Sequence, residues 1–163
     1  MKVIPLTQGK FAKIDDDDFR RVSQWKWCAI NKGGGRFYAG RQIGKRPFRK
    51  LLRMQNLIMP PLDGFLVDHI DGNTLNNCRS NLRLASELQN LRNRKLGSKN
   101  TSGFKGVWLH RKSNQWVARI GVNYKYLFLG MFDDKKEAAR AYDMAAEKHF
   151  GEFAKTNAMM GLF

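Results

Sequence analysis

Four polar residues in the middle of the chain have the types and the spacing to hydrolyse a phosphodiester. Asp68 and His69 are adjacent, and Asn81 and Asn90 follow them. Carboxylate and amide oxygens are hard ligands, which suit Mg²⁺ or Mn²⁺ better than a soft metal. A neutral imidazole can take a proton from an attacking water near pH 7, while a metal ion neutralises charge in the transition state. The pattern therefore predicts a metal-assisted hydrolytic site.

A strand, a turn, a second strand and a helix have to position these side chains. The apolar run 65–67 predicts a short strand, and the polar stretch 71–80 is rich in turn-forming residues. Leucine alternation over 82–84 predicts a half-buried second strand. Ser86 has the character of a helix cap, so we expect Asn90 to lie on a helix, facing back to the first strand.

Strand geometry sets a condition on the first pair. Successive side chains of a strand point to opposite faces, so Asp68 and His69 can share a site only if the strand end is distorted. Asn93 lies three residues after Asn90 on the same helical face, which leaves a ligand one turn further along as an alternative. The asparagines of the turn are interpreted as turn formers: Asn73, Asn76 and Asn77.

The segments 66–73, 77–84 and 89–90 resemble the HNH homing endonucleases of phages and mobile introns. The resemblance covers roughly residues 50–95, and its motifs are specific. In that family a β-hairpin and a helix clasp one divalent ion, which is the ββα-metal fold. Relatives often carry a histidine–arginine pair where this chain has 54–56, Met-Gln-Asn, so a role for Gln55 is not carried over.

The resemblance implies a role for each of the four residues. Asp68 and Asn90 would bind the metal ion. His69 would be the general base. Asn81 would hold the loop by hydrogen bonds to its backbone and so keep His69 oriented.

Charge points to a polyanionic partner. The chain has 30 basic and 14 acidic side chains, a net charge of +16. Such an excess repels itself in a compact fold and is usually offset by a polyanion. The stretch 36–53 holds seven basic residues and no acidic one, and is interpreted as a surface that follows phosphates, with a solvated face as the alternative. The residues assigned to DNA are Arg41, Lys45, Arg46, Arg49, Lys50 and Arg53.

The C-terminal third has strand periodicity followed by helix signals. Apolar residues alternate over 107–110, 116–120 and 126–129, which predicts three strands of one antiparallel sheet. Asp134 caps a helix that Gly151 ends. Alternation turns Leu109 and Leu127 inward with the other core residues. It turns outward the residues assigned to DNA, which are Trp108, His110, Arg119 and Tyr126, with Lys105 beside them.

This third also has a family likeness. The stretch 100–157 resembles an AP2/ERF-type DNA-binding domain, which implies a three-stranded sheet packed on one helix, with the outer face of the sheet in the major groove. We therefore expect an α+β chain. The ββα-metal (HNH) nuclease domain would span 1–95, with a basic β-rich part at 1–59 and the metal motif at 60–95. A linker at 96–104 and the AP2-like domain at 105–163 would follow.

Other classes of protein are disfavoured. No apolar run approaches the roughly 20 residues that span a bilayer, so no membrane partner is expected. The N-terminus lacks the pattern of a signal peptide, and Cys28 and Cys78, expected to be buried thiols, form no CxxC pair. These features favour the cytoplasm, that of the host cell if a phage encodes the chain.

The sequence thus predicts a metal-dependent endonuclease acting on double-stranded DNA, with a nick as the product of each active site. A double-strand break would require a homodimer or two events. The alternative is a DNA-binding regulator that keeps the HNH fold only as a scaffold. RNA cleavage is disfavoured because A-form RNA closes the groove that the outer sheet would enter.

Overall fold

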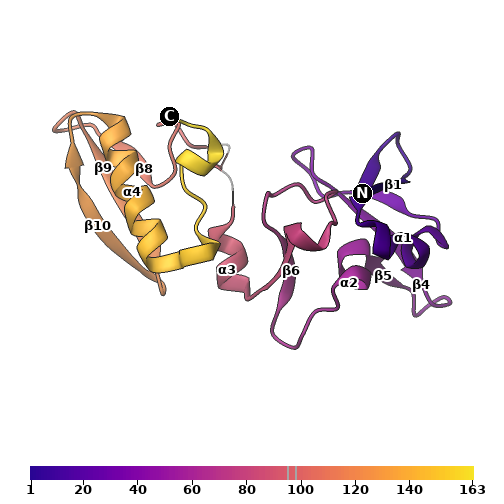
Figure 1. The fold of residues 1–163 in the computed structure, drawn as a ribbon. Helices are drawn as coiled ribbons and strands as arrows, with labels where there is room; N and C mark the ends of the chain where they lie inside the picture. Colours follow the sequence, from indigo (N-terminus) through magenta and orange to yellow (C-terminus); the bar gives the residue numbers. More distant parts are fainter. Residues whose placement is uncertain (95, 98) are drawn as a thin grey trace. The chain divides into compact units, whose positions relative to one another are not determined.

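The computed structural model describes residues 1–94, 96–97 and 99–163. The chain forms two compact units, Met1–Glu87 and Leu88–Phe163 (Figure 1). The sequence placed the division near residue 95, whereas the backbone contacts divide the chain between Glu87 and Leu88. Within the described residues no helix is long and apolar enough to cross a membrane.

The first unit is built from short antiparallel pairs and small helices. A hairpin of β1 and β2 turns at Gln8 and Gly9, both with positive φ, and the three-stranded sheet has the order β3-β4-β5. The strands β6 and β7 form a separate two-stranded sheet. In chain order the elements are β1 Lys2–Pro5, β2 Phe11–Ile14, α1 Asp16–Ser23, β3 Cys28–Asn31, β4 Phe37–Ile43, β5 Lys50–Arg53, α2 Met54–Ile58, β6 Leu66–His69, η1 Arg79–Asn81 and β7 Leu82–Ala85.

Most of these elements follow the local sequence. The acidic residues of the first turn of α1 suit the positive end of a helix, as predicted. The strand–loop–strand pattern around 31–35 is the β3–β4 pair. The sequence did not predict β5 or α2. The strand β5 forms the end of the basic stretch 36–53, and α2 follows it directly. Cys28 is exposed, contrary to expectation, because it alternates along β3 with the buried Ala29.

One apolar core holds this unit together. Its buried members come from β1, β2, α1, β4, α2 and β7, and the Trp27 indole N–H donates to the carbonyl of Val22 at 3.0 Å. Ile4, Ala12 and Ile14 share one face of the β1–β2 hairpin, and their burial joins the hairpin to α2 and β7. The buried core residues are Ile4, Ala12, Ile14, Val22, Trp27, Ala39, Met54, Ile58 and Leu82.

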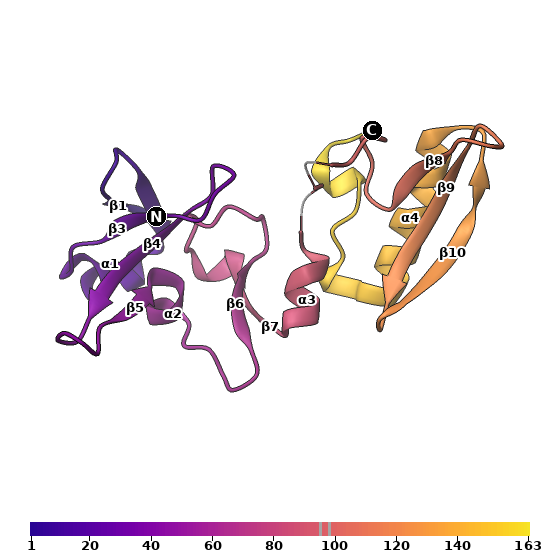
Figure 2. The ribbon, with the colours of Figure 1, turned by 180° about the vertical axis from the view of Figure 1, so that it is seen from behind.

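The second unit has the predicted three-stranded antiparallel sheet, in the order β10-β9-β8, packed against one long helix (Figure 2). The carboxylate of Asp134 accepts hydrogen bonds from the amides of Lys136 and Glu137 at 2.6 and 3.0 Å, and Gly151 ends the helix, so both predicted signals are confirmed. The elements are α3 Glu87–Arg92, which begins at the last residue of the first unit, β8 Val107–His110, β9 Gln115–Val122, β10 Lys125–Phe132, α4 Lys135–Phe150, η2 Gly151–Phe153 and η3 Ala158–Met160.

Small side chains let α4 lie close to the sheet. Ala138, Ala139 and Ala146 are buried against sheet residues such as Ala118 and Ile120. Alternation holds only in part at the edges. Leu109 and Leu127 were predicted to face inward but are each 38% exposed, because they lie on edge strands whereas α4 packs mainly over β9.

The predicted linker 96–104 is in part a folded segment, because residues 100–104 make hydrogen bonds and contribute to a core. The Asn100 side-chain amide donates to the carbonyl of Phe104 at 2.8 Å, and the Ser102 hydroxyl donates to the same carbonyl at 2.9 Å. Phe104 is buried in the core of the second unit. Residues 100–104 therefore belong to the fold of that unit. Lys95 and Ser98 lie outside the described residues.

Gly106 provides a test of the packing between β8 and α4. It has a φ of +76°, and a Cβ there would lie 1.9 Å from a ring carbon of Tyr142 and 2.8 Å from the carbonyl oxygen of Arg119. The Gly106→Ala substitution should destabilise the second unit by at least about 3 kcal/mol, from steric overlap plus backbone strain. Amide hydrogen exchange of α4 in the full chain measures this loss.

The matched control is Gly103→Ala. Gly103 has a φ of +81°, but nothing lies within 4 Å of its Cβ position. This change should cost only the backbone strain, about 1–2 kcal/mol. Equal losses for the two variants would contradict the described packing.

Candidate functional site

Asp68 and His69 end strand β6 and are both buried, at 7% and 3% exposure. The antiparallel register with β7 places Asp68 opposite Arg83 and His69 opposite Leu82. Nε and Nη2 of the Arg83 guanidinium both donate to Oδ2 of Asp68, each at 3.2 Å. The cation offsets the negative charge that the strand buries at Asp68.

The imidazole of His69 is held by an asparagine. Its Nε2 lies 3.1 Å from Oδ1 of Asn77, and its ring meets Tyr38 edge to face at 6.2 Å between centroids. Burial lowers the pKa of His69, while the Asn77 hydrogen bond and the charges of Asp68 and Asp71 oppose that effect. The net lowering keeps the imidazole neutral near pH 7. With the Asn77 oxygen as acceptor, Nε2 carries the proton and Nδ1 carries the basic lone pair.

Asn81 makes the hydrogen bonds to the loop that the sequence led us to expect. Its side-chain oxygen accepts from the amide of Asp71 at 3.0 Å, and its side-chain nitrogen donates to the carbonyl of Asn76 at 2.8 Å. The same nitrogen donates to the Asp71 carboxylate at 2.9 Å, and the Asn81 carbonyl accepts from the amide of Ile70. One buried side chain thereby closes the loop between β6 and β7.

The turn asparagines divide into two kinds. The Asn73 side chain accepts from the amide of Leu75 at 3.2 Å, which is the predicted turn role. Asn77 is fully buried and contacts His69, so it belongs to the site, although the sequence indicated only a turn former. A run of asparagines in a polar turn gives no local signal of which one points inward.

Asn90 and its alternative Asn93 lie at α3 and just beyond it, in the second unit, whereas Asp68, His69 and Asn81 lie in the first. Asp68, His69 and Asn81 therefore belong to the β6–β7 hairpin and its loop, but the register of β6 with β7 is unbroken and shows none of the distortion that was expected to bring Asp68 and His69 to one site. The pairing of Asn90 with Asp68 stays a prediction. In the described part of the chain, no group of three or more histidine, cysteine, aspartate or glutamate side chains could hold a metal ion. The predicted ligands are one carboxylate and one amide, and the buried carboxylate of Asp68 beside a neutral imidazole fits a hard cation.

The basic stretch lies on β4, β5 and the turn between them. Lys45, Arg46, Arg49 and Lys50 are exposed. Two further arginines are partly covered by aromatic rings, since Arg41 stacks on Trp25 at 3.7 Å and Arg53 lies 5.0 Å from the ring centroid of Tyr38. Tyr38 in turn contacts the ring of His69. The basic stretch therefore reaches the candidate site through one aromatic side chain.

The outer face of the second sheet carries one arginine between two rings. The Arg119 guanidinium lies 4.7 Å from the ring of Trp108 and 4.2 Å from that of Tyr126. A hollow at this place is lined in part by Gly106, Trp108, Arg119 and Tyr126. His110 is exposed nearby on β8, where its Nδ1 lies 2.8 Å from the hydroxyl of Ser113. The exposed Arg119 and Tyr126, with the half-buried ring of Trp108, have the character predicted for a nucleic-acid surface.

Lys105 does not share this exposure. Its ammonium donates to the backbone carbonyls of Arg92, Arg94 and Lys155 at 2.7, 3.0 and 3.3 Å. Burial lowers its pKa to about 8, and the charge of Lys155 adds to that effect. The structure therefore gives Lys105 an internal role, with three carbonyls on its ammonium, and a DNA contact by Lys105 stays a prediction.

Comparison with known proteins gives two family matches. The HNH endonuclease family matches residues 60–92, and the AP2 domain family matches residues 102–152. The second match extends to plant proteins. The chain is 48% identical over 62 residues to APETALA2-like protein 2 of Oryza sativa subsp. indica, which covers 37% of this chain and 14% of the plant protein.

Two viral proteins match over a longer stretch. Protein 3.8 of Escherichia phage T7 is 33% identical over 115 residues, which covers 71% of this chain and 94% of the phage protein. An uncharacterized HNH endonuclease of Acanthamoeba polyphaga mimivirus is 31% identical over 150 residues, which covers 92% of this chain and 76% of the mimivirus protein. An AP2 domain follows the nuclease motif in the sequence. The mimivirus relative and the family match, together with the Asp68–His69 pair and the loop closed by Asn81, show that the chain belongs to the HNH endonuclease family.

Proposed function

We propose that the protein is a metal-dependent homing-type endonuclease that binds duplex DNA and hydrolyses one phosphodiester bond per active site. The observation that carries the proposal is the pair formed by His69 and Asn77 beside the buried carboxylate of Asp68. This pair supplies a neutral base of fixed orientation, and the adjacent residue supplies a buried carboxylate. Both groups are needed at a hydrolytic phosphodiesterase site.

Asp68 and Asn90 would hold Mg²⁺ or Mn²⁺, one ion per site. When bound, such an ion supplies positive charge to the phosphate and to the leaving 3′ oxygen. The chain itself supplies the base, because Nδ1 of His69 can accept a proton from the attacking water. Its Nε2–H already donates to Asn77, so the ring keeps its orientation as it becomes positively charged.

DNA would be held by both units. The exposed basic residues of β4, β5 and their turn suit the phosphates, and the face around Arg119 suits the major groove. The basic residues of β4 and β5 would contact the DNA backbone, and the face around Arg119 would set the preference for a DNA site. A monomer with one active site makes a nick, and a double-strand break would then require a homodimer or two separate events.

The direct test is incubation of the full chain with supercoiled plasmid. We expect open-circular product with Mg²⁺ or Mn²⁺ and none with EDTA. Gel mobility shift run in parallel measures binding to the same DNA. Binding without cleavage at any divalent ion concentration would support the DNA-binding regulator and overturn the nuclease.

The His69→Ala substitution should remove the base and leave DNA binding unchanged. Single-turnover cleavage should fall about 10²–10⁴-fold, the usual contribution of a general base. The matched control is His149→Ala, since His149 is exposed near the end of α4. Wild-type cleavage by His69→Ala would show that this imidazole is not the base.

Affinity for DNA should depend steeply on salt, because a chain of net charge +16 binds largely through phosphates. The slope of log K against log salt should be about −0.9 per neutralised phosphate. Arg119→Ala should weaken binding and make the slope less steep by about 0.9, the value for one phosphate contact. Arg140→Ala is the matched control, because Arg140 lies on α4, against the ring of Phe163, and not on the outer face. Equal effects of the two substitutions would rule out the Arg119 face as the DNA surface.

A further inference from the structure

We propose that the acidic start of α1 positions the general base. In this arrangement Asp15 and Asp18 hold Arg79, and Arg79 fixes the segment that carries Asn77. The inference rests on the proposed function, because it concerns the orientation of His69 as a base. It assigns a role to the run of four aspartates at 15–18, which the nuclease motif does not include.

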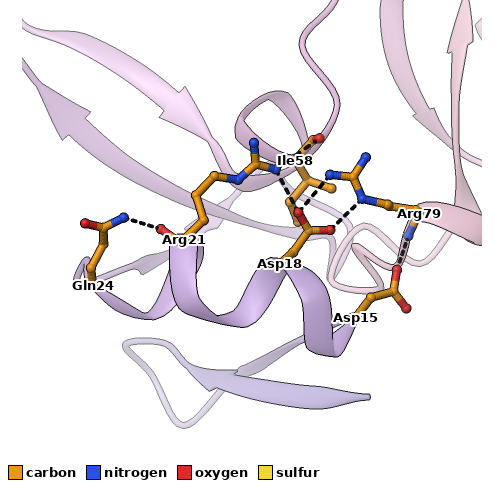
Figure 3. A network of polar contacts seen from close by, with 6 residues as sticks. All are labelled: Asp15, Asp18, Arg21, Gln24, Ile58 and Arg79. Atoms are coloured by element: carbon orange, nitrogen blue, oxygen red, sulfur yellow. Dashed lines mark hydrogen bonds and ion pairs between the residues drawn. The ribbon is translucent and has the colours of Figure 1, made fainter.

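Asp18 is a buried carboxylate, 3% exposed, between two arginines (Figure 3). Its Oδ2 accepts from Nε of Arg79 at 2.8 Å, and its Oδ1 accepts from Nη2 of Arg79 at 2.9 Å. The same Oδ1 accepts from Arg21 at 2.7 Å. Two parallel bonds from one guanidinium fix direction as well as distance, which a single contact does not do.

Asp15 holds the main chain of the same arginine. Its Oδ2 accepts from the backbone amide of Arg79 at 2.7 Å, so Arg79 is fixed at both its side chain and its backbone (Figure 3). Arg79 is the first residue of η1, and Asn81, which closes the loop, is the last. The helix α1 therefore determines where η1 begins.

Strand β2, directly before α1, holds the other side of the segment. The amide of Lys13 donates to the carbonyl of Leu75 at 2.8 Å, and the amide of Asn77 donates to the carbonyl of Lys13 at 2.8 Å. Residues 75–79 are thus bound at one end by β2 and at the other by Asp15 and Asp18. Asn77 lies inside this short stretch, and its side chain reaches Nε2 of His69.

These contacts indicate positioning more than core stability. Arg79 is outside the apolar core, and its side chain is 52% exposed, so the pair with Asp18 adds little apolar burial. Its effect is to limit the movement of Asn77, and a misplacement of about 1 Å at a reacting group can cost about 10²-fold in rate. Pairing with arginines also neutralises acidic charge that would otherwise repel phosphate.

The test compares Arg79→Gln and Arg79→Lys with the matched control Arg21→Gln in the full chain. Arg21→Gln removes the other cation on Asp18 and leaves the paired bonds to Arg79 intact. One measurement is the ¹⁵N chemical shift of the His69 ring nitrogens without metal or DNA, which reports the tautomer. The others are single-turnover cleavage of plasmid and the Kd for the same DNA.

For Arg79→Gln we expect a mixture of His69 tautomers, a cleavage rate about 10–100-fold lower and a Kd within about threefold of wild type. Arg79→Lys should recover part of the rate, because it keeps the charge but not the paired geometry. Arg21→Gln should match wild type. A single Nε2-protonated tautomer together with wild-type cleavage in Arg79→Gln would overturn the inference.

Two further outcomes are separated by the same measurements. If the wild-type chain cuts no DNA, the proposed function fails, and the tautomer in Arg79→Gln alone decides the positioning inference. If Arg79→Gln does not fold, Asp15→Asn replaces it, since it weakens the bond to the Arg79 amide and leaves the paired bonds between Arg79 and Asp18 in place. A tautomer mixture in folded Asp15→Asn supports the inference, and an unchanged tautomer overturns it.

Discussion

A buried imidazole requires a partner for its ring N–H, and that requirement organises the first unit. The partner of His69 is Oδ1 of Asn77, at 3.1 Å. Asn77 can supply it only if the loop between β6 and β7 keeps one shape, which Asn81 closes from inside. The loop in turn depends on β2 and α1, which bind it from outside. A hydrogen bond at the site therefore depends on the N-terminal strands and helix, far from it in sequence.

Local patterns in the sequence predicted the elements that depend on neighbouring residues. Asp134, Gly151 and the aspartates of α1 mark their helices by the chemistry of helix ends, and alternation predicted the sheet of the second unit. The adjacency of Asp68 and His69 likewise predicted a hydrolytic site, and that role stays a prediction. The structure confirms that both residues lie at the end of one strand and that Asn81 bonds to the loop.

The remaining parts depend on contacts between distant residues, which a local pattern does not contain. Arg79 and Asp18 are 61 positions apart, and nothing near either residue indicates the other. Lys105 has the composition of a DNA contact, yet three carbonyls from two other segments surround its ammonium. The edge positions Leu109 and Leu127 follow alternation but lie outside the main cover of α4. In each case the surroundings of the side chain depend on which distant segments the fold brings next to it, and the residue type alone does not predict them.

The arginines at Asp18 and those on the two predicted DNA surfaces are held in physically different ways. At Asp18 the carboxylate occupies guanidinium donors of Arg79 and Arg21, so those donors act inside the fold. Arg41, Arg53 and Arg119 instead lie against aromatic rings. A ring restrains the flat guanidinium through its face and leaves the N–H groups at its edge able to meet phosphate or a base. Restraint before binding lowers the entropy lost on binding, so aromatic support favours affinity where a carboxylate would compete with the DNA.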